Sequence, residues 1–197
     1  MARVDLPERH AVAQARRAVR DSLMSHGEEA VLVSVRHANA DAGEARCPGC
    51  WDDIYKQGRM PDCSRCFGTT FADPIKSAAR VWAVFTDTSQ NESVGPRGVW
   101  SGDDRGFQTE PFPGVIEHDF VVRVRNWSPA KVALSLEGVY IIQEVYQDSL
   151  RTGSQYGQSE LDVVGQRANV TRLHELTGIY QFPVVGKQFD RLDGLQR

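Results

Sequence analysis

The N-terminal stretch repeats its apolar residues with the period of an α-helix. Between residues 7 and 24, apolar side chains recur at spacings of three and four, at Val12, Ala15, Val19 and Leu23. Pro7 suits a first helical turn, and Gly27 suits the end of the helix. The pattern predicts one helix that either packs on its own domain or docks against a neighbouring subunit.

The remainder of the chain is dominated by short apolar runs that are typical of β-strands. Predicted strands cover residues 31–35, 81–86, 119–125, 139–146, 163–173 and 179–185. Residues 90–105 are rich in Gly, Ser and Asp and are predicted to form a loop, with a short edge at Val99-Trp100. Short strands separated by turn signals predict a mainly β fold, a small barrel or sandwich with an N-terminal helix.

All four cysteines lie between the first two predicted strands, in two Cys-x-x-Cys pairs: Cys47, Cys50, Cys63 and Cys66. This spacing presents four thiolates tetrahedrally to a Zn²⁺ ion. Pro48 and Gly49 suit the tight first turn, and Gly68 suits the turn after the second pair. The sequence therefore predicts a four-cysteine, zinc-ribbon-like module inserted into the β fold.

Other roles for the cysteines are open. Two disulfides would need an oxidising compartment. A thioredoxin-type redox pair would need one Cys-x-x-Cys on a strand-to-helix turn, and neither pair has that setting. A rubredoxin-like iron site uses the same ligands, so iron is the less favoured alternative to zinc. Four protein ligands leave no position for a substrate, which indicates an architectural role for the metal.

The placement of the cysteines gives a domain organisation. Residues 1–28 form a helix or arm, residues 29–45 and 72–190 the β domain, residues 46–71 the inserted metal module, and residues 191–197 a tail. The module has few apolar residues, so its stability is expected to come from the ion. Five apolar side chains are available for a tiny core or for packing on the β domain: Trp51, Ile54, Tyr55, Phe67 and Phe71.

Composition is ordinary for a globular chain, with 197 residues, 41% hydrophobic and 25% charged. No apolar run approaches the roughly 18 residues of a membrane helix. The first ten residues carry charges where a signal peptide has its apolar region. The expectation is a cytosolic origin with reduced cysteines and no membrane partner.

The charge balance argues against a nucleic-acid reader. The formal net charge is −3, and four thiolates with one Zn²⁺ would bring it to about −5. Charges between the cysteine pairs cancel: Asp52, Asp53 and Asp62 against Lys56, Arg59 and Arg65. Zinc ribbons that bind DNA or RNA usually present a basic face.

A polar segment, residues 149–159, separates two of the predicted strands. It contains glycine and has Arg151 as its one charged residue. An ordinary exposed loop is one interpretation; a loop that reaches a partner or a channel is the other. The candidate contact residues are Arg151, Thr152, Gly153, Gln155 and Tyr156.

No residue pattern points to catalysis. The five histidines share no ligand spacing: His10, His26, His37, His118 and His174. The carboxylates Asp103-Asp104 and Glu117 with Asp119 have no companion motif that would make them a metal site. Nucleophile-elbow, phosphate-loop and zinc-protease motifs are absent from the sequence. We expect a protein that is not an enzyme.

Two stretches carry a resemblance to a known family. The segments Cys47-Pro-Gly-Cys-Trp-Asp-Asp53 and Cys63-Ser-Arg-Cys-Phe-Gly-Thr-Thr-Phe71 resemble the zinc knuckle of some head-to-tail connector proteins of tailed bacteriophages. Leu136-Glu-Gly-Val-Tyr-Ile-Ile-Gln-Glu-Val145, followed by Leu150-Arg-Thr-Gly153, resembles the strand pair of their small β-barrel head-closure (stopper) proteins. Together the matches cover about half of the chain.

The resemblance implies a virion structural protein, made in the bacterial cytoplasm and placed in the neck. Such proteins form homo-oligomeric rings between a portal or adaptor and the tail-tube or tail-terminator proteins, with DNA passing through. A ring of acidic subunits would repel DNA and would therefore let it slide through the channel. The alternative is an intracellular zinc-ribbon protein that binds nucleic acid or a transcription complex. A third hypothesis is a zinc- or iron-dependent redox enzyme.

Overall fold

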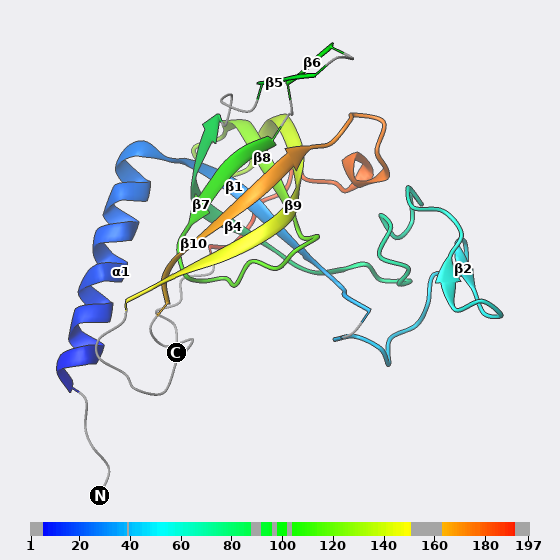
Figure 1. Cartoon of the computed structure of the whole chain (residues 1–197), viewed down its shortest axis with the longest axis horizontal. Coiled ribbons are helices and arrows are strands. Elements are labelled where there is room, and N and C mark those ends of the chain that lie inside the picture. Colours follow the sequence, from blue (N-terminus) through cyan, green and yellow to red (C-terminus); the bar gives the residue numbers. More distant parts are fainter. Residues whose placement is uncertain are drawn as a thin grey trace, which may run out of the picture.

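The computed structural model describes most of the chain (Figure 1). The described residues are 6–38, 40–87, 92–95, 98–101, 104–150 and 163–191. One helix, α1 (Leu6–His26), precedes a body made of β-strands. The predicted helix at residues 7–24 is therefore confirmed, and a short 3-10 helix, η2 (Gly178–Gln181), lies near the end of the described chain.

Six antiparallel strands close into a barrel, in the order β1-β4-β7-β10-β9-β8. Their bounds are β1 Glu28–Val35, β4 Ile75–Asp87, β7 Asp104–Thr109, β8 Phe120–Trp127, β9 Ala133–Ser149 and β10 Val163–Arg172. Closure pairs every barrel strand on both sides and so removes free sheet edges. The predicted mainly β fold is confirmed, and of the two architectures considered it is the barrel.

Two apolar clusters lie on opposite faces of the barrel wall. The cluster inside the barrel includes Leu32, Phe107 and Tyr140. The second cluster, which includes Val33 and Ile179, lies between the outer side of β1, β8 and β9 and the C-terminal segment. Because both faces of β1 are covered, its sequence is a continuous apolar run rather than an alternating one.

The prediction of a strand at residues 179–185 is wrong. This segment forms η2 and then an irregular path, with local bonds such as Phe182 N–H to the carbonyl of Ile179. Pro183 has no N–H to offer a sheet ladder. Its apolar side chains, including Ile179 and Val184, are buried on the outside of the barrel instead. A prediction from apolar content alone therefore assigned a strand where the chain is irregular.

Part of the predicted loop at residues 90–105 is strand. A hairpin of β5 (Glu92–Gly95) and β6 (Gly98–Ser101) occupies it, and β7 begins at Asp104. The glycine-rich composition concealed β7, which contains Gly106 and pairs with both β4 and β10. Tertiary pairing therefore overrides the weak local strand preference.

Helix α1 packs on its own barrel, against β4 and β10. Val12 and Leu23 are buried there. The Arg20 guanidinium donates at 2.9 Å to the carboxylate of Glu110, which also accepts from Arg191 at 2.6 Å. The helix ends before Gly27, where an added Cβ would lie 2.5 Å from the Leu23 carbonyl oxygen. Among the described residues, no helix has both the length and the apolarity to cross a membrane.

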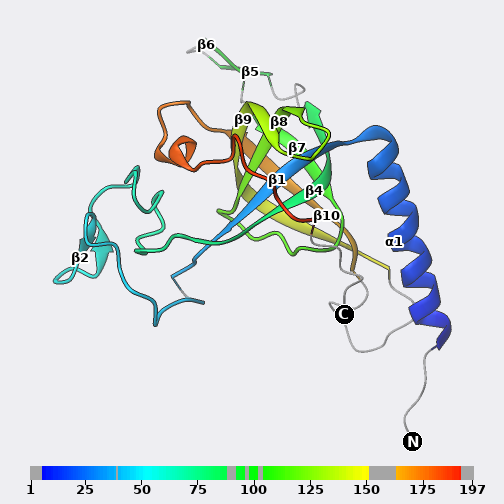
Figure 2. The ribbon, with the colours of Figure 1, turned by 180° about the vertical axis from the view of Figure 1, so that it is seen from behind.

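The cysteine-containing segment projects from the barrel on the side opposite α1, as both views show (Figures 1 and 2). It carries its own two-stranded hairpin, β2 (Trp51–Asp52) and β3 (Gln57–Gly58).

Candidate metal centre

Backbone pairing closes the cysteine segment at its base. Arg46 and Phe71 form an antiparallel β-bridge. On either side of it, the Cys47 N–H donates to the Thr70 carbonyl at 2.8 Å and the Ala72 N–H to the Ala45 carbonyl at 2.9 Å. Residues 46–71, called the metal module below, therefore form a long loop whose two ends are held together at this bridge.

Each Cys-x-x-Cys pair sits on a tight turn. In the first, the Trp51 N–H donates to the Cys47 carbonyl at 3.0 Å, and in the second the Phe67 N–H donates to the Cys63 carbonyl at 2.7 Å. Gly68 follows with φ +84°, a conformation that favours glycine. An added Cβ there would lie 2.6 Å from the Pro61 carbonyl oxygen. Gly68 is therefore required by the second turn, as predicted.

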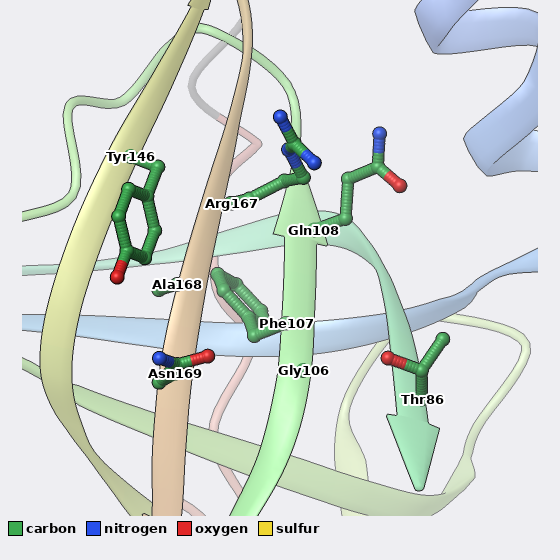
Figure 3. Close-up of a pocket in the computed structure, with 8 residues that line it drawn as sticks. All are labelled: Thr86, Gly106, Phe107, Gln108, Tyr146, Arg167, Ala168 and Asn169. Atoms are coloured by element: carbon green, nitrogen blue, oxygen red, sulfur yellow. The ribbon is translucent and has the colours of Figure 1, made fainter. Parts of the chain in front are cut away.

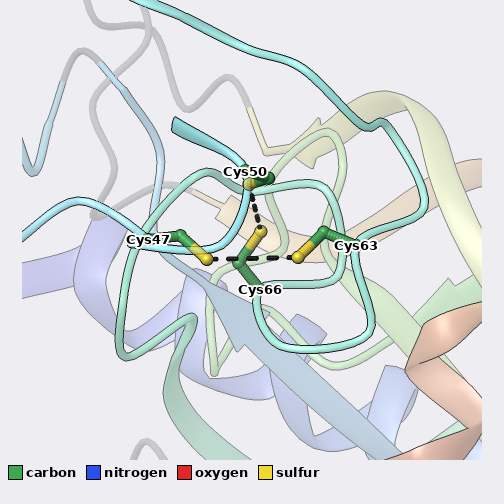
Figure 4. Close-up of side chains that lie close together, drawn as sticks. All are labelled: Cys47, Cys50, Cys63 and Cys66. Atoms are coloured by element: carbon green, nitrogen blue, oxygen red, sulfur yellow. Dashed lines mark hydrogen bonds between the residues drawn. The ribbon is translucent and has the colours of Figure 1, made fainter. Parts of the chain in front are cut away.

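The two turns face each other and bring all four sulfur atoms together (Figure 4). The Sγ atoms of Cys47 and Cys63 are 4.0 Å apart, those of Cys50 and Cys66 are 3.2 Å apart, and all four lie within 4.8 Å of one another. Tetrahedral metal–sulfur bonds of about 2.3 Å would separate sulfurs by roughly 3.8 Å. All four are free cysteines, which excludes the two-disulfide arrangement in this structure.

Burial strongly affects the protonation of the four cysteine thiols. The four side chains are at most 6% exposed. Burial and hydrogen bonds from Cys66 and other cysteines raise the pKa of the Cys50 thiol, and burial also raises that of Cys66. Burial opposes ionisation of Cys63 as well, but the N–H groups of Cys66 and Arg65 lower its pKa to about 7. A cation is therefore needed to stabilise four thiolates here.

The donor set fits a thiophilic metal ion. Four buried sulfurs within 4.8 Å of one another suit a closed structural site, in which the protein supplies every ligand position. Zinc and iron both accept this ligand set. The sequence prediction that these four residues meet at one point is confirmed, and the site is suited to holding a metal ion.

Other side chains of the metal module pack around its base. Phe71 is fully buried, and the Arg46 guanidinium lies 4.4 Å from the ring centroid of Trp51. The predicted tiny core is nevertheless smaller than expected. Ile54 is 84% exposed and Tyr55 is 73% exposed, because both lie in the turn between β2 and β3 and point away from this core.

The second cysteine turn rests on the C-terminal segment. Phe67 packs against the outer apolar cluster that contains Ile179. Gly178, at the start of η2, approaches the same turn so closely that an added Cβ would lie 3.0 Å from the Ser64 Cα. The metal module is thus seated on the barrel through η2 as well as through its base.

The predicted contact loop falls outside the part of the chain that the structure describes. Arg151, Thr152, Gly153, Gln155 and Tyr156 all lie outside the described residues, and their role stays a prediction. The same holds for the proposed tail beyond Arg191.

Sequence reasoning missed the buried carboxylate of Asp119. It accepts hydrogen bonds from the N–H of Val35 at 2.9 Å and of Ile116 at 3.3 Å, and its Oδ1 lies 3.3 Å from the Nε2 of His37. It therefore ties the end of β1 to the start of β8. No local signal could have found it, since Val35 is 84 residues away.

Comparison with known proteins gives no family. The chain matches no known family model and no curated protein sequence.

Proposed function

We propose that this protein is a zinc-containing structural subunit of a ring in the head-to-tail connector of a tailed bacteriophage. It would serve as a head-closure (stopper) or adaptor protein in the virion neck, linking the portal to the tail around the DNA channel. Cys47, Cys50, Cys63 and Cys66 would hold the Zn²⁺ ion, with iron as the less favoured metal. The sequence resemblance supplies the connector role.

One observation carries the architectural part of this proposal. The four buried sulfurs would fill every ligand position of a tetrahedral ion, and they lie in a module that projects from a closed barrel. A metal held in this way stabilises a protruding surface and has no position for a substrate. A closed barrel gives rigid walls without free edges, which suits a repeated assembly subunit.

The zinc-ribbon alternative, a nucleic-acid or transcription-complex binder, has less support in the metal module. Arg46 is stacked on Trp51, and the Arg59 Nε donates to Asp52 at 2.9 Å. These two basic side chains are therefore engaged in contacts within the module, whereas a nucleic-acid reader would present its basic groups to phosphates.

Three measurements on the purified chain separate these functions: metal content, native mass and affinity for duplex DNA at about 50 and 200 mM salt. We expect one zinc per chain, assemblies of several copies and no salt-dependent DNA binding. Cryo-electron microscopy of DNA-filled particles should then place the protein between portal and tail. Its absence from such particles, or tight salt-dependent DNA binding, would overturn the proposal.

The channel role of the predicted contact loop has its own test. Particles assembled with a chain lacking residues 152–158 should lose packaged DNA. If filled heads retain their DNA, this loop does not close the channel, although the connector role of the rest of the chain would stand.

A further inference from the structure

Phe67, the residue after the last cysteine, has a backbone conformation that a bulky side chain rarely adopts. Its φ is +52°, in the left-handed region that favours glycine, and the following Gly68 has φ +84°. Contacts must therefore hold Phe67 in this conformation against its own preference. Strained positions of this kind persist only where the surrounding structure fixes them, and they concentrate in segments with a function.

The second cysteine turn supplies these contacts. In the candidate metal centre, Cys63 and Cys66 are ligands at its two ends, so a bound ion would fix the distance between their sulfurs. The Phe67 N–H donates to the Cys63 carbonyl at 2.7 Å, and the Thr69 hydroxyl donates to the Cys66 carbonyl at 2.7 Å. The conformation of Phe67 is therefore tied to the closed turn, and we expect the closed turn to depend on the metal.

The ring of Phe67 connects the metal module to the barrel. It is partly buried against the outer apolar cluster, which contains residues of β1 and β8 together with Ile179 and Val184. Among residues 46–71, all of which the structure describes, Phe67 alone packs against this cluster. The position of one side chain thus links the cysteine turn to the outer face of the barrel.

The 3-10 helix η2 lies directly against the same turn. A Cβ added to Gly178 would be 3.0 Å from the Cα of Ser64 and 3.4 Å from the Cys63 carbonyl oxygen. The Tyr180 hydroxyl holds η2 to β9, because it accepts from the Val139 N–H at 3.1 Å. η2 therefore contacts both the cysteine turn and the barrel, and a change in the turn will alter its packing.

We propose that Phe67 is a metal-dependent latch between the metal centre and η2. With a metal ion bound, the closed turn keeps Phe67 in its left-handed conformation and its ring against the outer apolar cluster, so η2 is well packed. When the ion is lost, the Phe67 backbone relaxes, its ring leaves the cluster and η2 loosens. This inference rests on the metal-binding part of the proposed function and adds a regulatory role for the metal.

The latch makes the surface of the barrel depend on the metal content of the chain. η2 supplies Ile179 to the outer apolar cluster, where this side chain is buried. A chain without metal would expose more of the cluster, whereas a loaded chain presents a fixed surface. In a structural subunit, this difference would favour assembly from metal-loaded chains.

The barrel wall on the α1 side is an internal reference. It carries a hollow of about 350 Å³ on β4, β7, β9 and β10 (Figure 3). Polar side chains there bond within the wall: the Asn169 amide donates to Glu144 at 3.0 Å, and the Arg167 Nε to Asp148 at 3.0 Å. The metal module lies on the opposite side of the barrel (Figures 1 and 2). The latch should therefore have no effect on this wall.

Amide hydrogen exchange of the full chain, with zinc and after chelation, tests the latch. In the wild type, chelation should accelerate exchange of residues 177–182 about tenfold, the effect of losing the contacts of a partly buried phenylalanine ring. Strands β7 and β10 should exchange at the same rate in both states. Exchange of residues 177–182 that does not change on chelation would overturn the latch.

Variants of Phe67 separate the latch from a general loss of structure. Phe67→Gly removes the ring and accepts a left-handed backbone, so it should hold one zinc per chain and yet exchange residues 177–182 rapidly. Phe67→Tyr keeps the ring and should behave as wild type. Tyr55→Ser is the control, because Tyr55 is an exposed aromatic residue of the same module. Slow exchange of residues 177–182 in zinc-loaded Phe67→Gly would contradict the proposal.

The coupling must also act in the reverse direction. Gly178→Val places a side chain against the Ser64 Cα and lifts η2 from the turn without changing a cysteine. It should weaken zinc affinity about tenfold, measured by competition with a chromophoric chelator. Leu176→Ser, at an exposed position, should leave zinc affinity unchanged. A loosened η2 with wild-type zinc affinity would refute the latch.

The latch and the proposed function fail on different results. A chain that binds zinc but shows no coupling to η2 refutes the latch and leaves the connector function in place. A chain that binds no metal refutes the metal-binding part of the proposed function, and the latch with it. The connector role fails on its own test, absence of the protein from particle necks.

Discussion

The Arg46 guanidinium lies 4.3 Å from the ring centroid of Phe71, the residue that pairs with Arg46 across the base of the metal module. The same guanidinium lies 4.4 Å from the ring centroid of Trp51, and its Nη1 donates to the Thr70 hydroxyl at 3.1 Å. One cation in contact with two rings thus links the first cysteine turn to the end of the module.

We expect Arg46→Ala to loosen this base. Loss of two cation–π contacts should lower the free energy of unfolding by about 1–2 kcal/mol, measured by urea denaturation of the zinc-loaded chain. Arg65→Ala is the matched control, because Arg65 is an exposed arginine of the same module. Equal stability of the two variants would show that the stacking of Arg46 contributes nothing.

Two glycines beside the cysteines should differ sharply in their tolerance of alanine. Gly68 has φ +84° and no room for a Cβ, whereas a Cβ at Gly49 would meet its nearest atom, Arg65 Cδ, at 3.6 Å, an ordinary contact. Gly68→Ala should therefore cost about 1–3 kcal/mol, and Gly49→Ala should be close to neutral. Thermal unfolding of both variants, each loaded with zinc, checks this; similar losses would contradict the geometry of the second turn.

The metal centre was predictable because its information is local. Two-residue gaps between cysteines place sulfurs on one turn whatever surrounds them, and helical periodicity likewise located α1. Strand β7 was misassigned because its pairing with strands that are distant in the sequence outweighs its local composition. The segment at 179–185 was misassigned because the effect of Pro183 outweighs its apolar composition. The exposure of Ile54 and Tyr55 was also hidden, since composition does not show which apolar residues face outward.

Asp119 should make stability depend on pH. Burial raises the pKa of its carboxyl above the ordinary 3.8, against the lowering effect of the Val35 N–H and His37. Above pH 3.8 the native chain retains a proton that the unfolded chain has lost. The stabilisation from Asp119 is therefore greatest at low pH and is lost as pH rises through the raised pKa.

Asp119→Asn removes this titration. The free energy of unfolding of the parent chain minus that of the variant should decrease from pH 4 to pH 7. Both chains carry His37→Gln, so that the imidazole beside Asp119 does not titrate. A difference that stays flat or grows with pH would mean that the carboxyl has no raised pKa.

Metal removal tests the central claim, that an ion bound by four cysteines stabilises the metal module on an otherwise independent barrel. The measurement is amide hydrogen exchange of the zinc-loaded chain before and after chelation, read by mass spectrometry for residues 46–71 and for the barrel strands. We predict that chelation greatly accelerates exchange throughout residues 46–71, because apolar packing there is slight, and leaves β1, β8 and β9 protected. Unchanged exchange in residues 46–71 after complete loss of the metal would contradict the account.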